Sequence, residues 1–309
     1  MTTALYYHPQ CLEHVTGDDH PESPERLRAV LAALDALQAE RLDHRLAIPA
    51  TRDQISLVHD RDYVAAIMAA APGRGLLDLG DGTMISPGSV AAALLAVGAV
   101  CGAVEAVLDG AVQTAFCAVR PPGHHAEPNR AMGFCLFNNV AIGARYALSR
   151  GDVRRVAIID FDVHHGNGTQ VVVDPDPALM LLSTHQSPLY PGTGAADQVG
   201  DHANVINIPL AAGSGSPEFR RAVTARLAPA LARFPPDLIM ISAGFDAHWR
   251  DPLADLNLVE DDFRWVTRKL VELARLYCRG RIVSTLEGGY DVAALASCCV
   301  AHVRALAAP

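Results

Sequence analysis

Short apolar runs alternate with longer segments of helical period along most of the chain. Seven short runs predict strands, at residues 4–7, 115–119, 156–159, 179–183, 205–208, 238–242 and 282–286. Six longer segments predict helices, at residues 24–39, 87–108, 139–149, 217–234, 258–279 and 292–307. The hydrophobicity of the strands is continuous rather than alternating, which is typical of parallel strands buried between two layers of helices. This order of elements predicts an α/β fold with a doubly wound, largely parallel sheet.

Glycine and proline gather where the predicted strands end, in the segments PPGHH, YPGTG, AGSGSP, SAGFD and EGGY. In open parallel sheets, ligands bind at the carboxyl ends of the strands. No repeat, low-complexity tract or linker-like stretch divides the chain, so we expect one catalytic domain over residues 1–309.

Composition narrows the classes of partner. The net charge of -9 provides no positive field for a phosphate backbone, so we expect no direct nucleic-acid partner. The seven cysteines include no CxxC pair, which indicates reduced thiols and a cytoplasmic protein. The first residues lack the basic start and apolar core of a signal peptide, and the apolar stretch 90–100 is too short to cross a bilayer. We therefore expect no membrane partner.

Two predicted strands run into residues that could bind a metal ion. Asp162 and His164 stand two apart in the segment DFDVHHGNG, so on an extended chain they project to the same side. Asp246 follows another strand after a glycine turn and is the natural third ligand. Two carboxylates and one imidazole leave positions open for water and substrate, as catalytic metal sites require. Asp162 and His164 could instead cap the next helix or pair with each other, but burying so many polar residues without a role would be costly.

Further polar residues follow other strands and suit amide hydrolysis. His124 and His125 could supply a base for the attacking water and an acid for the leaving amine, although a histidine pair on a loop is more often merely solvated. Asp160 and Asn167 could orient these imidazoles through their second nitrogens. Tyr290 is presented by two glycines and could donate to a developing oxyanion, but by itself it would be an ordinary turn residue.

Taken together, these motifs resemble a known family. RPPGHH, GFCLFNN, DFDVHHGNGTQ, YPGTG, SAGFDAH and LEGGY occur here in the order seen in histone deacetylases and acetylpolyamine amidohydrolases. The similarity runs from HPESPER, at residues 20–26, to Tyr290. The GNGTQ and EGGY forms are similar to the class II branch and to bacterial deacetylase-like amidohydrolases.

This resemblance implies an arginase/deacetylase-like three-layer α/β/α fold and hydrolysis of N-acetyl amides. It implies zinc bound by the two aspartates and the histidine named above, and it allows iron(II) in place of zinc. It also implies potassium near that centre, bound through backbone carbonyls at Asp160, Asp162, His164, Ser183 and Thr184.

The resemblance also assigns catalytic roles. His125 would be the main general base and acid, and His124 would tune the electrostatics through Asp160. Tyr290 would bind the substrate carbonyl. Arg26 matches an arginine that lines an internal channel through which acetate could leave, although a helix-surface arginine fits the sequence equally well.

Substrate-binding positions follow by the same resemblance. Phe134 and Tyr190 would line a narrow acyl-lysine channel, with Gly133 beside them. Tyr190 is a departure, because the second ring is usually phenylalanine. Asp81 corresponds to a rim acid that grips the substrate backbone, although its loop is shifted by a residue. Leu253 stands where polyamine-specific relatives place a carboxylate, which favours acyl-lysine as the substrate.

Three functions therefore remain open. The first is deacylation of acetyl-lysine in peptides or proteins, the second is hydrolysis of acetylated polyamines, and the third is non-catalytic binding of acylated ligands. An arginase-type dimanganese enzyme is disfavoured, because the segment DFDVHH has too few carboxylates for two ions. A homo-oligomer is compatible with each function, since a partner subunit could supply an acid to the site.

Overall fold

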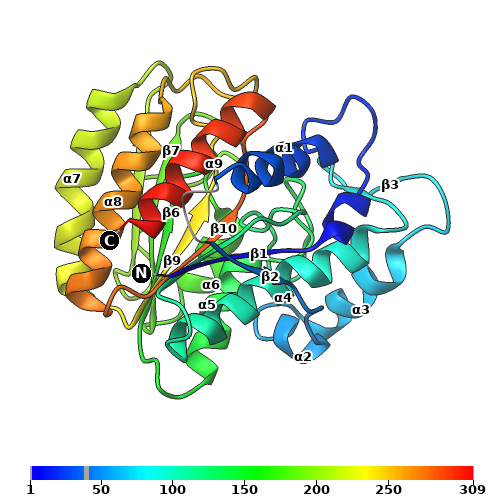
Figure 1. Cartoon of the computed structure of the whole chain (residues 1–309), viewed down its shortest axis with the longest axis horizontal. Helices are drawn as coiled ribbons and strands as arrows, with labels where there is room; N and C mark the ends of the chain where they lie inside the picture. Colours follow the sequence, from blue (N-terminus) through cyan, green and yellow to red (C-terminus); the bar gives the residue numbers. More distant parts are fainter. Residues whose placement is uncertain (1, 38–41, 309) are drawn as a thin grey trace.

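A computed structural model describes residues 2–37 and 42–308, and it is built on one large sheet (Figure 1). All neighbouring strands in this eight-stranded sheet are parallel, in the order β2-β1-β5-β10-β9-β6-β7-β8. The strands are β1 (Thr3–Tyr7), β2 (Leu42–Leu46), β5 (Thr114–Cys117), β6 (Val156–Asp160), β7 (Leu179–Gln186), β8 (Val205–Leu210), β9 (Leu238–Ala243) and β10 (Ile282–Leu286). The seven predicted strands are thereby confirmed, within a few residues at their ends.

Helices cover both faces of the sheet (Figure 1). One layer contains α4 (Ser89–Leu108), α5 (Asn139–Ser149) and α6 (Asn167–Val173). The other contains α1 (Pro24–Asp35), α7 (Ser216–Arg233), α8 (Glu260–Tyr277) and α9 (Val292–Ala307). This three-layer arrangement confirms the predicted fold class. The predicted helix 24–39 ends at Asp35, and its last two positions lie outside the described residues.

The continuous hydrophobicity of the central strands has the expected cause. Every residue of β5, β6, β7, β9 and β10 is buried, because each strand has a neighbour on both sides and helices above and below. All seven cysteines are free and buried, as core residues are.

Helix α4 is longer than the apolar stretch considered in the sequence. By length and composition alone it could cross a membrane, but 72% of its apolar window is buried inside the protein. It packs against β1, β5, β10 and α5. A core helix and a membrane span share this composition, so α4 is weak grounds for a membrane location.

Several elements escaped the sequence analysis. They are η1 (Pro9–Glu13), β2, α2 (Arg52–Ile55), α3 (Arg61–Ala70), α6 and the antiparallel pair β3 (Leu77–Asp78) and β4 (Met84–Ile85). Strand β2 lies at the edge of the sheet and reads LDHRL, with no buried residue. A strand paired on one side needs no apolar run, and most of the other elements are too short for periodicity to give a signal. Helix α3 is the exception, because its sequence RDYVAAIMAA is amphipathic and buries Val64 and Ile67.

Candidate functional site

Asp162, His164 and Asp246 converge beyond the carboxyl ends of the neighbouring strands β6 and β9. His164 Nδ1 lies 3.1 Å from Asp162 Oδ1 and 3.1 Å from Asp246 Oδ2. All three side chains are buried, and one ligand atom from each lies within 4.8 Å of the others. Among the described residues this is the one such cluster of buried histidines, cysteines and carboxylates. The alternative of helix capping is excluded, because the N-cap of α6 is Gly166.

The second oxygen of each carboxylate is held by the backbone. Gly288 N–H donates to Asp162 Oδ2 at 2.8 Å, and Val163 N–H donates to Asp246 Oδ1 at 2.8 Å. The remaining oxygens therefore face His164 and the centre of the cluster. A Cβ atom at Gly288 would lie 2.0 Å from Asp246 Oδ2, so a side chain there would disrupt the cluster. The glycine turn in EGGY thus serves the aspartates as well as Tyr290.

The electrostatics of the cluster favour a bound cation. Burial and the neighbouring charge of Asp162 together raise the pKa of the Asp246 carboxyl to about 7. Two buried carboxylates this close repel each other unless a proton or a cation lies between them. Two carboxylates and one imidazole are also ligands that zinc accepts. The residues present therefore fit a divalent metal ion.

The two histidines beyond β5 lie beside this cluster in different electrostatic states. His124 Nδ1 lies 3.0 Å from Asp160 Oδ2. Burial opposes protonation of His124, but the charges of Asp162 and Asp160 outweigh it and raise the pKa of His124 well above its usual range. Burial lowers the pKa of His125 well below its usual range, and the neighbouring His124 lowers it further. His125 is therefore the neutral imidazole of the pair.

Asn167, the first residue of α6, is the partner of His125. Its Oδ1 lies 2.8 Å from His125 Nδ1. His125 thus faces a neutral amide, whereas His124 faces the carboxylate of Asp160. This difference in partner is consistent with the opposite pKa shifts of the two imidazoles.

Tyr290 lies on the opposite side of the cluster, in the turn after β10. Its ring centroid is 6.5 Å from that of His164, and its backbone N–H donates to Asp251 Oδ2 at 2.7 Å. Arg26 lies against the same turn: its guanidinium carbon is 5.0 Å from the Tyr290 ring centroid, and its Nε donates to Gly289 O at 2.6 Å. Arg26 is fully buried and also pairs with Glu22, so the reading of it as a helix-surface arginine was wrong.

Aromatic rings flank the approach to the cluster. The Tyr190 ring centroid lies 5.2 Å from that of His125, and the Phe134 ring centroid lies 6.1 Å from that of Tyr290. Gly133 has a φ of 54° and lies so close to His125 that a Cβ atom would be 2.4 Å from its ring.

The two expected rim residues lie nearer to solvent. Leu253 is 36% exposed, and its backbone N–H donates to Asp251 Oδ1 at 3.0 Å. Asp81 is exposed and forms an ion pair of 3.4 Å with Arg130.

The positions expected to bind potassium lie on adjacent strands. Asp160 of β6 is directly opposite Ser183 of β7, and both are buried with Thr184. Ser183 Oγ lies 2.9 Å from His185 Nδ1, and Asp160 Oδ1 accepts a bond of 3.0 Å from Asp162 N–H. Potassium binding itself stays a prediction.

Four polar residues around the site received no role from the sequence. Glu287 accepts bonds from Gly123 N–H at 2.6 Å and from His124 N–H at 3.1 Å, so it ties the histidine loop to the end of β10. Burial raises the pKa of its carboxyl to about 7. The others are Asp251, Arg120, which pairs with buried Glu22, and Glu127, which lies next to Asn167. The signal that could have indicated them was position: Arg120 and Glu287 stand within the motifs RPPGHH and LEGGY, and Glu127 and Asp251 stand a few residues beyond a motif.

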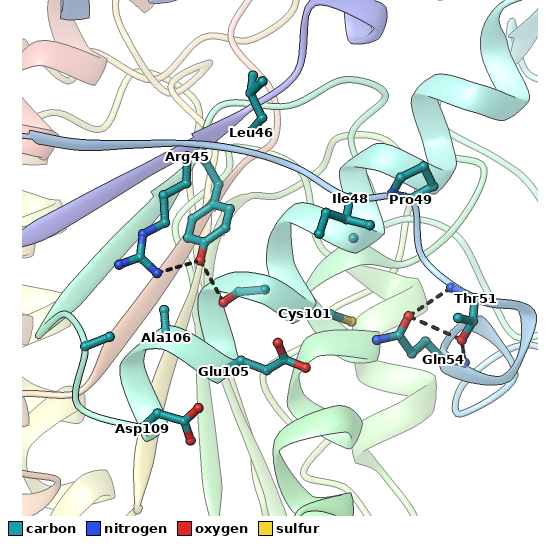
Figure 2. Close-up of a pocket in the computed structure, with 14 residues that line it drawn as sticks. Arg45, Leu46, Ile48, Pro49, Thr51, Gln54, Cys101, Glu105, Ala106 and Asp109 are labelled. Carbon is teal, nitrogen blue, oxygen red and sulfur yellow. Dashed lines mark hydrogen bonds between the residues drawn. The ribbon is translucent and has the colours of Figure 1, made fainter.

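A surface hollow of about 530 Å³ lies away from these residues, between α4 and the segment that follows β2 (Figure 2). We call it the β2–α4 hollow; its lining includes Tyr6, Arg45, Ile48, Gln54, Cys101 and Glu105. Its polar groups are bonded to each other: Arg45 Nη1 donates to Tyr6 Oη at 3.2 Å, and Tyr6 Oη donates to Gly102 O at 2.9 Å. Arg45 also pairs with Asp43. No cluster of potential metal ligands among the described residues lies there.

Comparison with known proteins agrees with this arrangement. The model of the histone deacetylase domain matches residues 20–306. A histone deacetylase-like amidohydrolase of Pseudomonas aeruginosa is 36% identical over 98% of this chain and 86% of its own length. A probable deacetylase of Archaeoglobus fulgidus is 37% identical over 94% of this chain and 82% of its own length. The crystal structure of the HDA15 HD domain superposes with a TM-score of 0.93 at 33% identity, over 99% of this chain and 88% of that one.

The fold and these similarities define a hydrolase that acts on amide bonds and has an arginase/deacetylase-like α/β fold. The chain belongs to the histone deacetylase family.

Proposed function

We propose that this protein is a zinc-dependent deacylase that removes acetyl groups from lysine side chains of peptides or proteins. The observation that supports it most strongly is the convergence of Asp162, His164 and Asp246 beside a neutral histidine. Zinc held by these three residues would lower the pKa of a bound water and polarise the substrate carbonyl. The same ligands could hold iron(II).

The protein's own residues supply the proton transfers. His125 is the base of choice, because its lowered pKa leaves a nitrogen free to accept the proton of the attacking water. The same imidazole then returns the proton to the leaving lysine amine. His124 has a raised pKa and stays protonated, so it contributes positive charge beside the developing oxyanion. Asp160 stabilises that charge from behind.

Tyr290 completes the proposed site. Burial raises the pKa of its phenol well above the usual value, so the hydroxyl keeps its proton and can donate it in a hydrogen bond to the oxyanion. The bond from Tyr290 N–H to Asp251 and the contact with Arg26 hold the turn in place. The guanidinium of Arg26 already donates to Glu22 and to Gly289 O. Release of acetate past Arg26 would therefore require its side chain to move.

Acetyl-lysine fits the approach to the site better than an acetylated polyamine. The rings of Phe134 and Tyr190 lie near Tyr290 and His125, where their apolar faces would pack against the methylene chain of lysine. A polyamine carries further positive charges and would favour an unpaired carboxylate at the mouth. Leu253 occupies one candidate position for such a group, so no carboxylate is present there.

The test is a comparison of substrates with the zinc-loaded protein. We expect kcat/KM for an acetyl-lysine peptide to exceed that for acetylspermidine by at least about tenfold, a difference of about 1.4 kcal/mol in transition-state binding. Chelation should abolish turnover, and zinc should restore it. A preference for acetylspermidine would instead support the polyamine amidohydrolase. Binding of acetyl-lysine without release of acetate would support the non-catalytic alternative.

A further inference from the structure

Asn167 has contacts on both sides of its amide group, of which the contact with His125 is one. Its Oδ1 lies 2.8 Å from His125 Nδ1. Its Nδ2 donates to Glu127 Oε1 at 2.8 Å, and it lies within 3.4 Å of His125 O and within 3.3 Å of Met132 Sδ. All three atoms around Nδ2 are acceptors. The surroundings of Nδ2 therefore require a donor at that position.

This requirement fixes which way the amide points. If the Asn167 amide were rotated by 180°, its oxygen would face the Glu127 carboxylate, and two acceptors would meet without a proton between them. The Glu127 carboxylate supplies the shortest of the three contacts and the one full charge. Glu127 is thus the main group that keeps Oδ1 on the side of His125.

The orientation of the amide in turn sets the tautomer of His125. Because Asn167 presents an acceptor oxygen, His125 Nδ1 carries the hydrogen and donates it. The lone pair is then on Nε2, the nitrogen free to take a proton from water. With the amide reversed, Nδ1 would accept from Asn167 and Nε2 would carry the hydrogen, so the imidazole could not act as the base.

Glu127 is well placed for this task because its backbone is fixed by a tight turn. Glu127 N–H donates to Arg130 O at 3.0 Å, and Arg130 N–H donates to Glu127 O at 3.3 Å. Pro128 O, within the turn, accepts from Asp60 N–H at 2.9 Å. The carboxylate therefore reaches Asn167 from a rigid support rather than from a loose loop.

We propose that Glu127 is a positioning residue that acts through Asn167 to hold His125 in the tautomer that serves as the general base. The inference rests on the proposed function for its kinetic consequence, but its structural content is the tautomer alone. His124 is bonded directly to a carboxylate, whereas His125 has its carboxylate one residue further away. This separation orients the imidazole of His125 without placing a negative charge in contact with it.

The kinetic test compares two substitutions at Glu127 in the zinc-loaded protein. Glu127→Ala removes the acceptor and should lower kcat for an acetyl-lysine peptide by about 10- to 100-fold, the usual cost of losing a group that orients an active-site histidine. KM should change by less than about twofold, because substrate contacts are intact. Glu127→Gln keeps an acceptor oxygen and should stay within about threefold of the wild type. Asn129→Ala, at an exposed position in the same turn, is the matched control and should leave kcat unchanged.

The second readout is the tautomer itself, measured by nitrogen-15 NMR of histidine-labelled, zinc-loaded protein. We expect His125 to carry its hydrogen on Nδ1 in the wild type and in Glu127→Gln, and to show a mixture of tautomers in Glu127→Ala. The signal is assigned by its loss in His125→Gln.

Two results would overturn the inference: an unchanged tautomer in Glu127→Ala, or equal losses of kcat in the alanine and glutamine variants. If the wild type cleaved no acylated substrate, the proposed function would fail while the tautomer measurement still decided the role of Glu127.

Discussion

The buried cluster beyond the carboxyl ends of β6 and β9 and the β2–α4 hollow both contain charged side chains, but the two regions differ in how those charges are compensated. In the hollow, Arg45 is satisfied by Tyr6 and by the nearby Asp43, and Ile48 is 79% exposed beside them. At the strand ends, Asp162 and Asp246 are fully buried, and each turns one oxygen toward the same small space.

The difference shows that the volume of a hollow is a poor guide to chemistry. Buried like charges that face each other are costly, and a fold keeps them only if something else compensates. Exposed ion pairs such as Arg45–Asp43 cost little and do little. Buried charges that repel each other therefore distinguish the functional region, whereas the volume of a hollow does not.

The largest effect is expected from removing the charge of Asp246, which follows the carboxyl end of β9. Asp246→Asn keeps the shape of the side chain but removes a ligand charge, so zinc should be lost and turnover should fall by at least about 1000-fold, or about 4 kcal/mol. Zinc content and deacetylation are measured together. Asp237→Asn, at the other end of the same strand, is the matched control and should retain both, because its oxygen still accepts from Arg154 N–H and Arg155 N–H. Full activity in Asp246→Asn would remove the basis of the proposed metal site.

A smaller effect is expected from a single hydroxyl. Tyr290→Phe should lower kcat by about 100- to 1000-fold, because one donor to the oxyanion is lost. Zinc content should be unchanged, which separates this variant from Asp246→Asn. Tyr6→Phe removes a hydroxyl in the β2–α4 hollow instead, and it should leave kcat as in the wild type. If Tyr290→Phe and Tyr6→Phe lowered kcat equally, the site and the β2–α4 hollow would not differ in function as proposed.

The free energy of unfolding should depend on pH, because the carboxyl of Glu287 is buried. Burial raises the pKa of the Glu287 carboxyl from 4.5 to about 7, so the folded protein binds a proton more tightly there than the unfolded chain does. The contribution of Glu287 to stability is therefore lost as the pH rises from about 4.5 to about 7, by an amount on the order of 3 kcal/mol, and does not change above that. Glu287→Gln removes the ionisation and keeps an acceptor for Gly123 N–H and His124 N–H.

Denaturant unfolding of both proteins at several pH values measures this effect. The glutamine variant should become the more stable of the two as the pH rises through this window, with no further gain above about pH 7. A difference in stability that does not vary with pH would contradict the raised pKa of Glu287.

Much of this architecture could be predicted from the sequence because burial leaves a strong pattern. The strands β6, β9 and β10 are continuous apolar runs, and the motif residues Asp162, His164 and Asp246 directly follow two of them. Parallel strands place their carboxyl ends along one edge, so residues far apart in the chain could be expected to meet.

The remainder depended on contacts that no local pattern encodes. Glu287 and Glu127 act on residues more than a hundred and about forty positions away in the chain, through single hydrogen bonds. For Arg26 the sequence fitted a channel and a helix surface equally well, but the ion pair with Glu22 and the carbonyls of the Tyr290 turn hold it inside. Strand β2 was missed because a polar edge strand carries no apolar run.

The smallest effect is expected from substitutions at the β2–α4 hollow. They change the chemistry of the surface strongly, and we expect them to leave stability, zinc content and activity unchanged. Ile48→Ser and Leu46→Ser replace side chains that are 79% and 59% exposed beside the β2–α4 hollow. Exposed substitutions away from caps and ion pairs shift stability by less than about 0.5 kcal/mol. The free energy of unfolding, zinc content and kcat/KM of the double variant should therefore match those of the wild type. A tenfold fall in kcat/KM with an intact fold would mean that the hollow communicates with the strand ends, since it shares no residue with the metal cluster. Helix α4 would then be the element that couples the two regions, because it packs against β5 and β10. Substituting Cys101, which lies on α4 and lines the hollow, with alanine would test that coupling.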